Sequence, residues 1–223
     1  MTDGQFFRWD DEMGRRSDHS RDELFEMALS AAREIAEEDG LKGLTIRRIA
    51  GKIGYSHGTL YNLFDDQDEL ILHLNGRTLD ALYDTLSAIP MTGDPDDDLL
   101  ALARGYFAFT RDSAKLWNLL FEHHLSDHQP LPDWHHQKIA RLLGLMDRCL
   151  DPLFGPERDA EKLHTARVIW SSLHGMCSLE TQRKLIPADS IEAMATSLVK
   201  NYLGGLRAST AEGADGVPPG SGP

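Results

Sequence analysis

The residues between positions 57 and 62 are of types that can meet the edges of DNA bases. If this segment is a helix, its outward side holds small, polar and aromatic residues and no acidic one. These residues are His57, Gly58, Thr59, Tyr61 and Asn62. Hydroxyl and amide groups can hydrogen-bond to base edges, a tyrosine can reach a phosphate or a thymine methyl group, and glycine permits close approach. With Leu60, Leu63 and Phe64 on the inward side, the spacing predicts a recognition helix over residues 57–64.

A second helix and a tight turn are expected directly before this segment. Its apolar residues recur at i, i+3, i+4 and i+7, and they are Ile46, Ile49, Ala50 and Ile53. Thr45 precedes them at an N-cap position, Gly54 follows where a left-handed residue often ends a helix, and Ser56 caps the next helix. Two helices joined in this way form a helix-turn-helix. The predicted DNA contacts are therefore Thr45, Arg47, Arg48, Ser56, His57, Gly58, Thr59, Tyr61 and Asn62.

The same stretch resembles a known family. TIRRIAGKIGYSHGTLYNLFDDQDEL, residues 45–70, resembles the DNA-binding signature of the TetR family of bacterial transcription regulators. In the C-terminal half, Trp170, His174 and Gly175 resemble the Trp…His-Gly signature of one TetR subclass. The chain departs from the family at Gln67, where members usually have a lysine that touches phosphate. One backbone contact is thus expected to be weakened or transferred to a backbone amide.

The chain is expected to be all-α, with an N-terminal three-helix helix-turn-helix domain and a C-terminal helical bundle, about nine helices in total. A capping box at Ser20 begins the first helix, which ends at Gly40. Later helices are expected to run from Asp66 to about Ser87 and over 99–112, 113–125, 133–150, 157–184 and 190–206. The predicted division is 1–17 flexible arm, 18–66 DNA-binding domain, 67–206 effector-binding and dimerisation domain, and 207–223 disordered tail. In the arm, Arg15 and Arg16 either reach the minor groove or belong to a disordered terminus.

Net charge limits the kind of nucleic-acid binding that is expected. The formal charge of the 223 residues is −13, and residues 15–75 alone hold 8 Lys+Arg against 12 Asp+Glu. Because counterion release requires cations against phosphates, this balance excludes a general nucleic-acid binder. It favours specific binding to one double-stranded operator, with weak non-specific binding and steep salt dependence.

Composition gives further expectations about location and cofactors. The two cysteines, Cys149 and Cys177, match no metal spacing and are too few for a disulfide framework, which favours a reducing cytoplasm. The N-terminal residues contain no apolar signal segment, and no apolar run is long enough to cross a bilayer. No membrane partner and no cofactor are expected.

The family resemblance implies an effector pocket and a homodimer in the second domain. Candidate ligand-binding residues are Phe107, Trp117, Phe121, Met146, Trp170 and His174, and a lipophilic effector is expected. A core role for these side chains stays open, including a His174 that is bonded to a neighbour. The predicted dimer interface uses helices 157–184 and 190–206, with apolar stripes that also face their own core. These stripes are Ile169, Leu173, Met176, Leu179 and Ile191, Met194, Ala195, Leu198, Tyr202.

Five histidines lie within residues 123–136. They are His123, His124, His128, His135 and His136. His124 and His128 have the i, i+4 spacing of zinc ligands on a helix. Since the helix is expected to end near Leu125 and no cysteine or carboxylate completes the set, a solvated loop is favoured over a metal site.

The function favoured by these patterns is a ligand-responsive regulator, most simply a repressor that binds a palindromic operator as a homodimer. An all-α enzyme is the weaker alternative, because the sequence has no glycine-rich phosphate loop, nucleophile elbow or usable metal spacing. A helical scaffold with degenerate DNA binding is the other alternative, and the acidic surroundings and Gln67 favour it.

Overall fold

The computed structural model describes residues 19–125, 130–182, 184 and 190–215. Within these residues the chain forms nine α-helices, three short 3-10 turns and no strand, so the predicted all-α class is confirmed. The helices are α1 Arg21–Asp39, α2 Ile46–Ile53, α3 His57–Tyr61, α4 Gln67–Ser87, α5 Pro95–Asp112, α6 Ala114–Glu122, α7 Asp133–Leu150, α8 Asp159–Thr181 and α9 Ile191–Asp215. The 3-10 turns are Leu41–Gly43, Asp151–Leu153 and Pro156–Arg158. The predicted arm, residues 1–17, lies outside the described residues.

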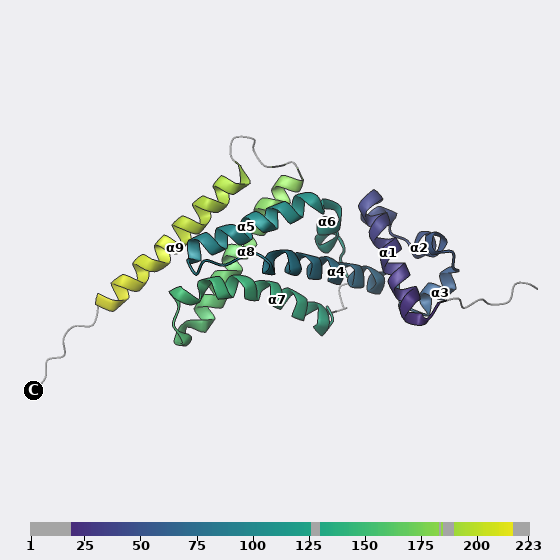
Figure 1. Ribbon diagram of the computed structural model, residues 1–223, viewed down its shortest axis with the longest axis horizontal. Coiled ribbons are helices and arrows are strands. Elements are labelled where there is room, and N and C mark those ends of the chain that lie inside the picture. The colour runs from purple at the N-terminus through teal and green to yellow at the C-terminus, as the bar shows by residue number, and fades with distance from the viewer. Residues whose placement is uncertain (1–18, 126–129, 183, 185–189, 216–223) are drawn as a thin grey trace, which may run out of the picture.

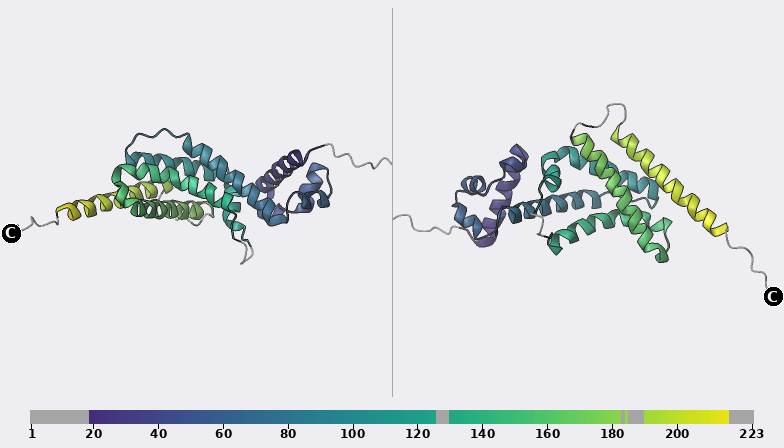
Figure 2. Two further views of the ribbon diagram at one scale, coloured as in Figure 1. Left: turned by 90° about the horizontal axis from the view of Figure 1, so that it is seen from below. Right: turned by 180° about the vertical axis from the view of Figure 1, so that it is seen from behind.

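The molecule is elongated, with α1, α2 and α3 grouped at one end (Figure 1). Helix α4 runs from this group into a bundle that contains α5, α7 and α8, and α9 lies along the opposite edge. The two further views in Figure 2 show the same separation of the N-terminal group from the bundle. The group therefore projects its far side, formed by α2 and α3, away from the rest of the chain.

The N-terminal group has its own hydrophobic core. Helix α1 begins with the predicted capping box, in which Ser20 Oγ accepts from the Glu23 amide at 3.2 Å and the Glu23 carboxylate accepts from the Ser20 amide at 2.6 Å. Its buried side meets α2, α3 and the start of α4 through residues that are almost fully excluded from solvent, including Ile35, Ile49 and Leu60. Each buried aliphatic side chain contributes roughly 1.5–3 kcal/mol, so the group is held together by packing.

Helix α6 belongs to two cores at once. Leu116 and Leu119 are buried in the core of the N-terminal group, whereas Trp117 is buried in the core of the bundle. At the start of α6, Lys115 Nζ also donates to the main-chain carbonyl of Glu38 at the end of α1. A displacement of α6 would therefore disturb both cores.

Several helix boundaries differ from those predicted. Helix α5 begins four residues before Leu99 because Asp94 caps it, its carboxylate accepting from the amides of Asp96 and Asp97 at 3.0 Å each. Helix α6 ends at Glu122 instead of Leu125. Helix α8 covers Asp159–Thr181 rather than 157–184, since a 3-10 turn occupies 156–158.

Helix α9 is longer than predicted. It continues nine residues past Leu206 to Asp215, so the expectation of a disordered tail from residue 207 is wrong for this part. Residues 207–209 are exposed, and the alanine, arginine and glutamate content of 207–215 favours helix formation. Arg207 also forms an ion pair with Asp96 at the start of α5. The rest of the predicted tail, 216–223, lies outside the described residues.

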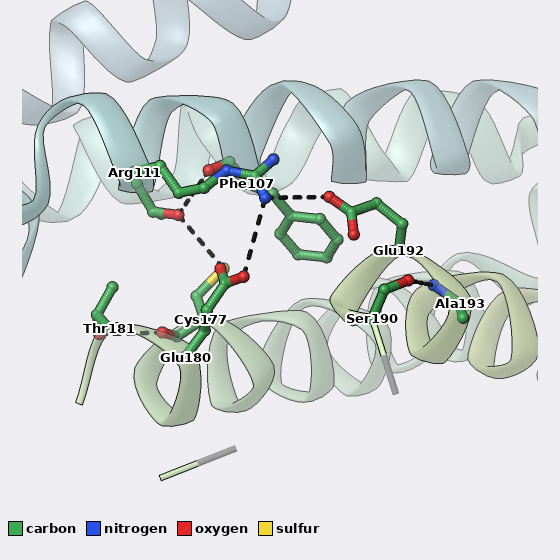
Figure 3. A network of polar contacts seen from close by, with 9 residues as sticks. Phe107, Arg111, Cys177, Glu180, Thr181, Ser190, Glu192 and Ala193 are labelled. Atoms are coloured by element: carbon green, nitrogen blue, oxygen red, sulfur yellow. Dashed lines mark hydrogen bonds and ion pairs between the residues drawn. The ribbon is translucent and has the colours of Figure 1, made fainter. Parts of the chain in front are cut away.

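A polar network joins α5 to the facing ends of α8 and α9 (Figure 3). Arg111 Nη1 lies 3.1 Å from a carboxylate oxygen of Glu192 on α9 and 3.8 Å from one of Glu180 on α8. Nearby, the Thr110 hydroxyl lies 3.7 Å from the Cys177 sulfur. Both cysteines are buried and unpaired, and burial raises the pKa of Cys149 to about 11 and that of Cys177 to about 12.

Candidate nucleic-acid interface

The connection between α2 and α3 has the predicted cap at each position. Thr45 Oγ1 accepts from the Arg48 amide at 3.2 Å, which caps α2. Gly54 ends α2 with φ 78° and ψ 22°, a left-handed conformation that only glycine adopts at low cost. Ser56 Oγ then accepts from the Thr59 amide at 3.2 Å and caps α3. The two helices are thus joined by the tight turn of a helix-turn-helix.

Helix α3 is shorter than the predicted recognition helix. It covers His57–Tyr61 and not 57–64. The Leu63 amide donates to the Leu60 carbonyl at 2.9 Å, so the chain tightens into a turn over Asn62 and Leu63. Leu60 and Phe64 are still buried, at 0% and 1% exposure, and they anchor the short helix to the core as predicted.

The outward side of α3 is open to solvent. His57, Gly58, Tyr61 and Asn62 are all exposed, Tyr61 to 54%. Among the described residues, no atom forms a hydrogen bond with the side chain of His57, Tyr61 or Asn62. A Cβ on Gly58 would meet only Ser56 Oγ at 3.7 Å, so the fold itself does not demand glycine there. These groups are free to meet a nucleic acid.

Three other predicted contacts have roles inside the fold. Thr45 and Ser56 are the N-caps described above. Thr59 is partly buried, and its hydroxyl lies 3.0 Å from that of Ser56. The Thr45 hydroxyl keeps its proton for a phosphate, as does whichever of the Ser56 and Thr59 hydroxyls accepts in the bond that they share.

The three cations of α2 differ in their surroundings. Arg47 is exposed and forms no ion pair with any described residue. Arg48 forms ion pairs with Asp39 and Glu38, the latter at 3.4 Å. Lys52 Nζ lies 2.9 Å from Glu34, and this hydrogen bond raises the pKa of Lys52. Acidic residues of α1 therefore hold two of the cations that were predicted to flank a groove.

Two contacts around this surface were not predicted. Gln67 Nε2 donates to the Leu44 carbonyl at 3.0 Å, so this residue joins α4 to the segment before α2. His19 Nδ1 lies 2.7 Å from the Tyr55 hydroxyl, which joins the start of α1 to the turn between α2 and α3. Sequence periodicity gives no signal for either pair.

The candidate effector residues lie around Tyr106 in the bundle. Trp117 Nε1 donates to the Tyr106 hydroxyl at 3.0 Å, and the same hydroxyl lies 3.1 Å from His174 Nδ1. The rings of Phe121 and Trp170 complete the group, with Phe121 4.1 Å from His174 and Trp170 4.9 Å from Tyr106 between ring centroids. Burial lowers the pKa of His174 and raises that of Tyr106, so both side chains are neutral near pH 7.

Space beside this aromatic group is small. Met146 and Trp170 line a cavity of about 10 Å³ together with Tyr106, whereas drug-sized ligands occupy roughly 300–1,000 Å³. Phe107 is fully buried in the bundle core and does not line this cavity. A ligand at this position would have to open the cavity.

The histidines of 123–136 do not all lie in a solvated loop. The His123 side chain is 6% exposed and bonds to Asp68 on α4 at 2.9 Å, and His135 on α7 is also 6% exposed. Both were predicted to lie in a solvated loop, and that prediction is wrong because His123 bonds to Asp68 on α4 and His135 lies on the buried side of α7. His128 lies outside the described residues. Among the residues described, no three His, Cys, Asp or Glu side chains are close enough to hold a metal ion.

Comparison with known proteins identifies the family. The sequence model for bacterial regulatory proteins of the tetR family matches residues 28–74, and the model for the tetracyclin repressor-like C-terminal domain matches residues 99–202. The chain belongs to the TetR family of transcriptional regulators. It is therefore a TetR-family DNA-binding regulator, and the residues of α2 and α3 described above lie within the matched DNA-binding region.

One sequence relative and two solved structures are similar to this TetR-family chain. The uncharacterized HTH-type transcriptional regulator YobS of Bacillus subtilis (strain 168) is 22% identical over 180 residues, which cover 81% of this chain and 91% of YobS. The crystal structure of the putative regulatory protein SCO4313 has a TM-score of 0.65 at 24% identity and covers 82% of this chain and 97% of its own. The transcriptional regulator SCO7222, a TetR from Streptomyces coelicolor, has a TM-score of 0.61 at 18% identity over 82% and 97% of the two chains.

Three histidines that are buried or half-buried make stability depend on pH in a defined window. Burial lowers the pKa of His73, His135 and His174 below the ordinary value of 6.5. Below pH 6.5 the unfolded chain therefore binds more protons than the folded chain. The free energy of unfolding is not reduced by these histidines above pH 6.5, and it decreases as the pH falls below that value. Urea unfolding is expected to give a smaller free energy of unfolding at pH 5.5 than at pH 7.5. His174→Gln should reduce this difference, and equal stabilities at both pH values would contradict the account.

No helix within the described residues is long and apolar enough to span a membrane.

Proposed function

We propose that this TetR-family protein represses transcription by binding a palindromic operator as a homodimer, and that a lipophilic ligand releases it. The observation that supports DNA reading by α3 is its open outward side, which projects from one end of the molecule (Figure 1). In the proposed complex His57, Tyr61 and Asn62 meet base edges and Gly58 permits close approach. Arg47 binds a phosphate, and Arg48 exchanges its carboxylate partners on α1 for a phosphate. Thr45, Ser56 and Thr59 hold the two helices in place or donate a hydroxyl proton to a phosphate.

Helices α8 and α9 are the proposed dimer interface, although only part of each predicted stripe is available. Ile169 and Leu173 are buried in the bundle core, as are Ile191 and Ala195, so these side chains cannot meet a partner. The available apolar residues are Met176, Leu179, Met194, Leu198 and Tyr202, of which Leu179 is 44% exposed. A two-fold dimer would place two α3 helices on successive half-sites of a palindrome.

Gly175 gives a specific test of this interface. It lies inside α8, where glycine costs about 1 kcal/mol relative to alanine, and a Cβ there would meet no atom within 4 Å. A second chain that crosses α8 closely would explain the glycine. Gly175→Leu is expected to weaken dimerisation at least tenfold in sedimentation equilibrium, with the fold intact by circular dichroism.

Gly144→Leu is the matched control for this substitution, because Gly144 is also a helical glycine at which an added Cβ would meet no atom within 4 Å. It lies on α7, outside the proposed interface, and should leave the dimer unchanged. If Gly175→Leu and Gly144→Leu dimerise equally well, α8 does not form the interface at this point.

Helix α6 is the proposed link between ligand and DNA. Trp117 and Phe121 on α6 contact His174 at 5.1 and 4.1 Å between ring centroids. Leu116 and Leu119 of the same helix are packed in the core of the N-terminal group. A ligand that opens the cavity near Tyr106 and Trp170 would displace these rings and move α6. Such a ligand favours a conformation in which the two α3 helices no longer match the half-sites.

Footprinting on the intergenic DNA that neighbours the coding region tests the proposed function. The expected result is protection of a palindrome that weakens steeply as salt concentration rises. A helical scaffold with degenerate DNA binding predicts no protected sequence at any salt concentration.

A further inference from the structure

A second cavity lies between the N-terminal group, formed by α1, α2 and α3, and the bundle. Its volume is about 220 Å³, and its walls come from α1, α4, the end of α5 and the start of α6. It is separate from the cavity near Tyr106 and Trp170, since the two share no lining residue. We call it the junction cavity.

The junction cavity is apolar at its base. Leu29 on α1, Leu74 on α4 and Leu116 on α6 line it and are each almost fully buried. Phe109 on α5 adds an aromatic wall that is half-buried. Such a surface suits a hydrocarbon chain, because burial of apolar area from both sides is favourable.

The mouth of the junction cavity is basic and rich in hydroxyl groups. Arg33 and Arg77 lie at it with Ser30 and Ser113, and none of its lining residues is acidic. This composition is unusual in a chain with 36 Asp+Glu and 23 Lys+Arg. Among the described residues, the hydroxyls of Ser30 and Ser113 have no hydrogen-bond partner.

Both arginines keep donors for a ligand. Arg77 Nη2 donates to Glu26 at 2.5 Å and Arg33 Nε donates to Glu37 at 2.9 Å, and these carboxylates lie on the exposed side of α1. Each guanidinium has five N–H donors in a planar fork, so one carboxylate does not saturate it. Exposed ion pairs are weak, so the same groups can turn toward an anion in the cavity mouth.

From this lining we infer that the junction cavity binds a small carboxylic acid with a hydrocarbon tail. The carboxylate would lie between Arg33 and Arg77, a pairing that guanidinium groups favour, and the tail would lie on Leu29, Leu74 and Leu116. A volume of about 220 Å³ corresponds to roughly seven water volumes, which suits a chain of about eight carbons. Because the cavity is bounded by α1 on one side and by the α5–α6 corner on the other, the bound acid holds the DNA-binding group in one position against the bundle.

Titration calorimetry of the full chain with octanoate tests this inference, with octylammonium as a probe of equal length and opposite charge. Octanoate is expected to bind saturably at one site per chain, and octylammonium at least tenfold more weakly. Arg77→Met should weaken octanoate binding at least tenfold, and Arg104→Met, an exposed arginine of α5 outside the cavity, should not. Ala81→Phe, at an exposed position that lines the cavity, should block binding without removing any core residue.

Two outcomes would overturn the inference. One is equal binding of octanoate and octylammonium, or octanoate binding that survives both Arg77→Met and Ala81→Phe. The other is loss of octanoate binding in His174→Leu but not in Arg77→Met, which would assign the acid to the cavity near Tyr106. Since these titrations contain no DNA, their failure is distinct from a failure of operator binding.

Discussion

Tyr61→Ala is expected to weaken operator binding roughly 5- to 150-fold, which corresponds to about 1–3 kcal/mol. Tyr61 is 54% exposed, and no described residue forms a hydrogen bond with its hydroxyl, so its removal leaves no buried donor unpaired. The free energy of unfolding should therefore change by less than about 0.5 kcal/mol. Fluorescence anisotropy with a labelled operator measures the affinity, and urea unfolding measures the stability.

Tyr61→Phe separates two contacts that the tyrosine can make. If the hydroxyl donates to a phosphate, Tyr61→Phe loses most of the affinity that Tyr61→Ala loses. If the ring contacts a thymine methyl group, Tyr61→Phe retains it. Full operator affinity in both folded variants would show that Tyr61 does not contact the operator.

The double variant Glu38→Gln and Asp39→Asn is expected to raise operator affinity roughly tenfold near 0.1 M salt. In the free protein these two carboxylates pair with Arg48, so a phosphate must compete with them for the guanidinium. Their neutralisation releases Arg48 and removes repulsion from DNA. The slope of log affinity against log salt should steepen by about one, as expected for one additional phosphate contact.

A matched control distinguishes the effect of these two carboxylates from the effect of net charge. Asp84→Asn with Glu161→Gln changes the formal charge by the same amount, and both residues are exposed on helices of the bundle. This control should change affinity much less, because charges beyond about 10 Å are largely screened at 0.1 M salt. Equal gains in the two double variants would show that overall charge, and not the α1 carboxylates, limits binding.

Local signals predicted the DNA-binding group closely. The caps at Ser20, Thr45 and Ser56 and the left-handed Gly54 were read from residue type and position, and each is present. Such features depend on a few neighbouring residues, so a single sequence contains them. The predicted length of α3 was wrong, because the inward placement of Leu63 and Phe64 is compatible with a tight turn as well as with a continued helix.

Contacts between distant segments could not be read in the same way. Arg48 was predicted to face DNA, but its pairing with Asp39 depends on how α1 crosses α2. The double role of α6 was also missed, although the sequence carries a signal for it. Its adjacent apolar residues Leu116 and Trp117, followed by Leu119 and Leu120, give the helix two apolar sides, as expected for a helix packed between two cores.

The central claim, that α3 reads bases, is tested most directly by site-specific photo-crosslinking. A benzophenone amino acid is placed at position 61 and, as a control, at exposed position 91 in the loop between α4 and α5. With the footprinted operator, the account predicts a crosslink from position 61 that maps to bases within a half-site, and none from position 91. An operator complex that is formed and saturated yet gives no crosslink from position 61 would contradict it.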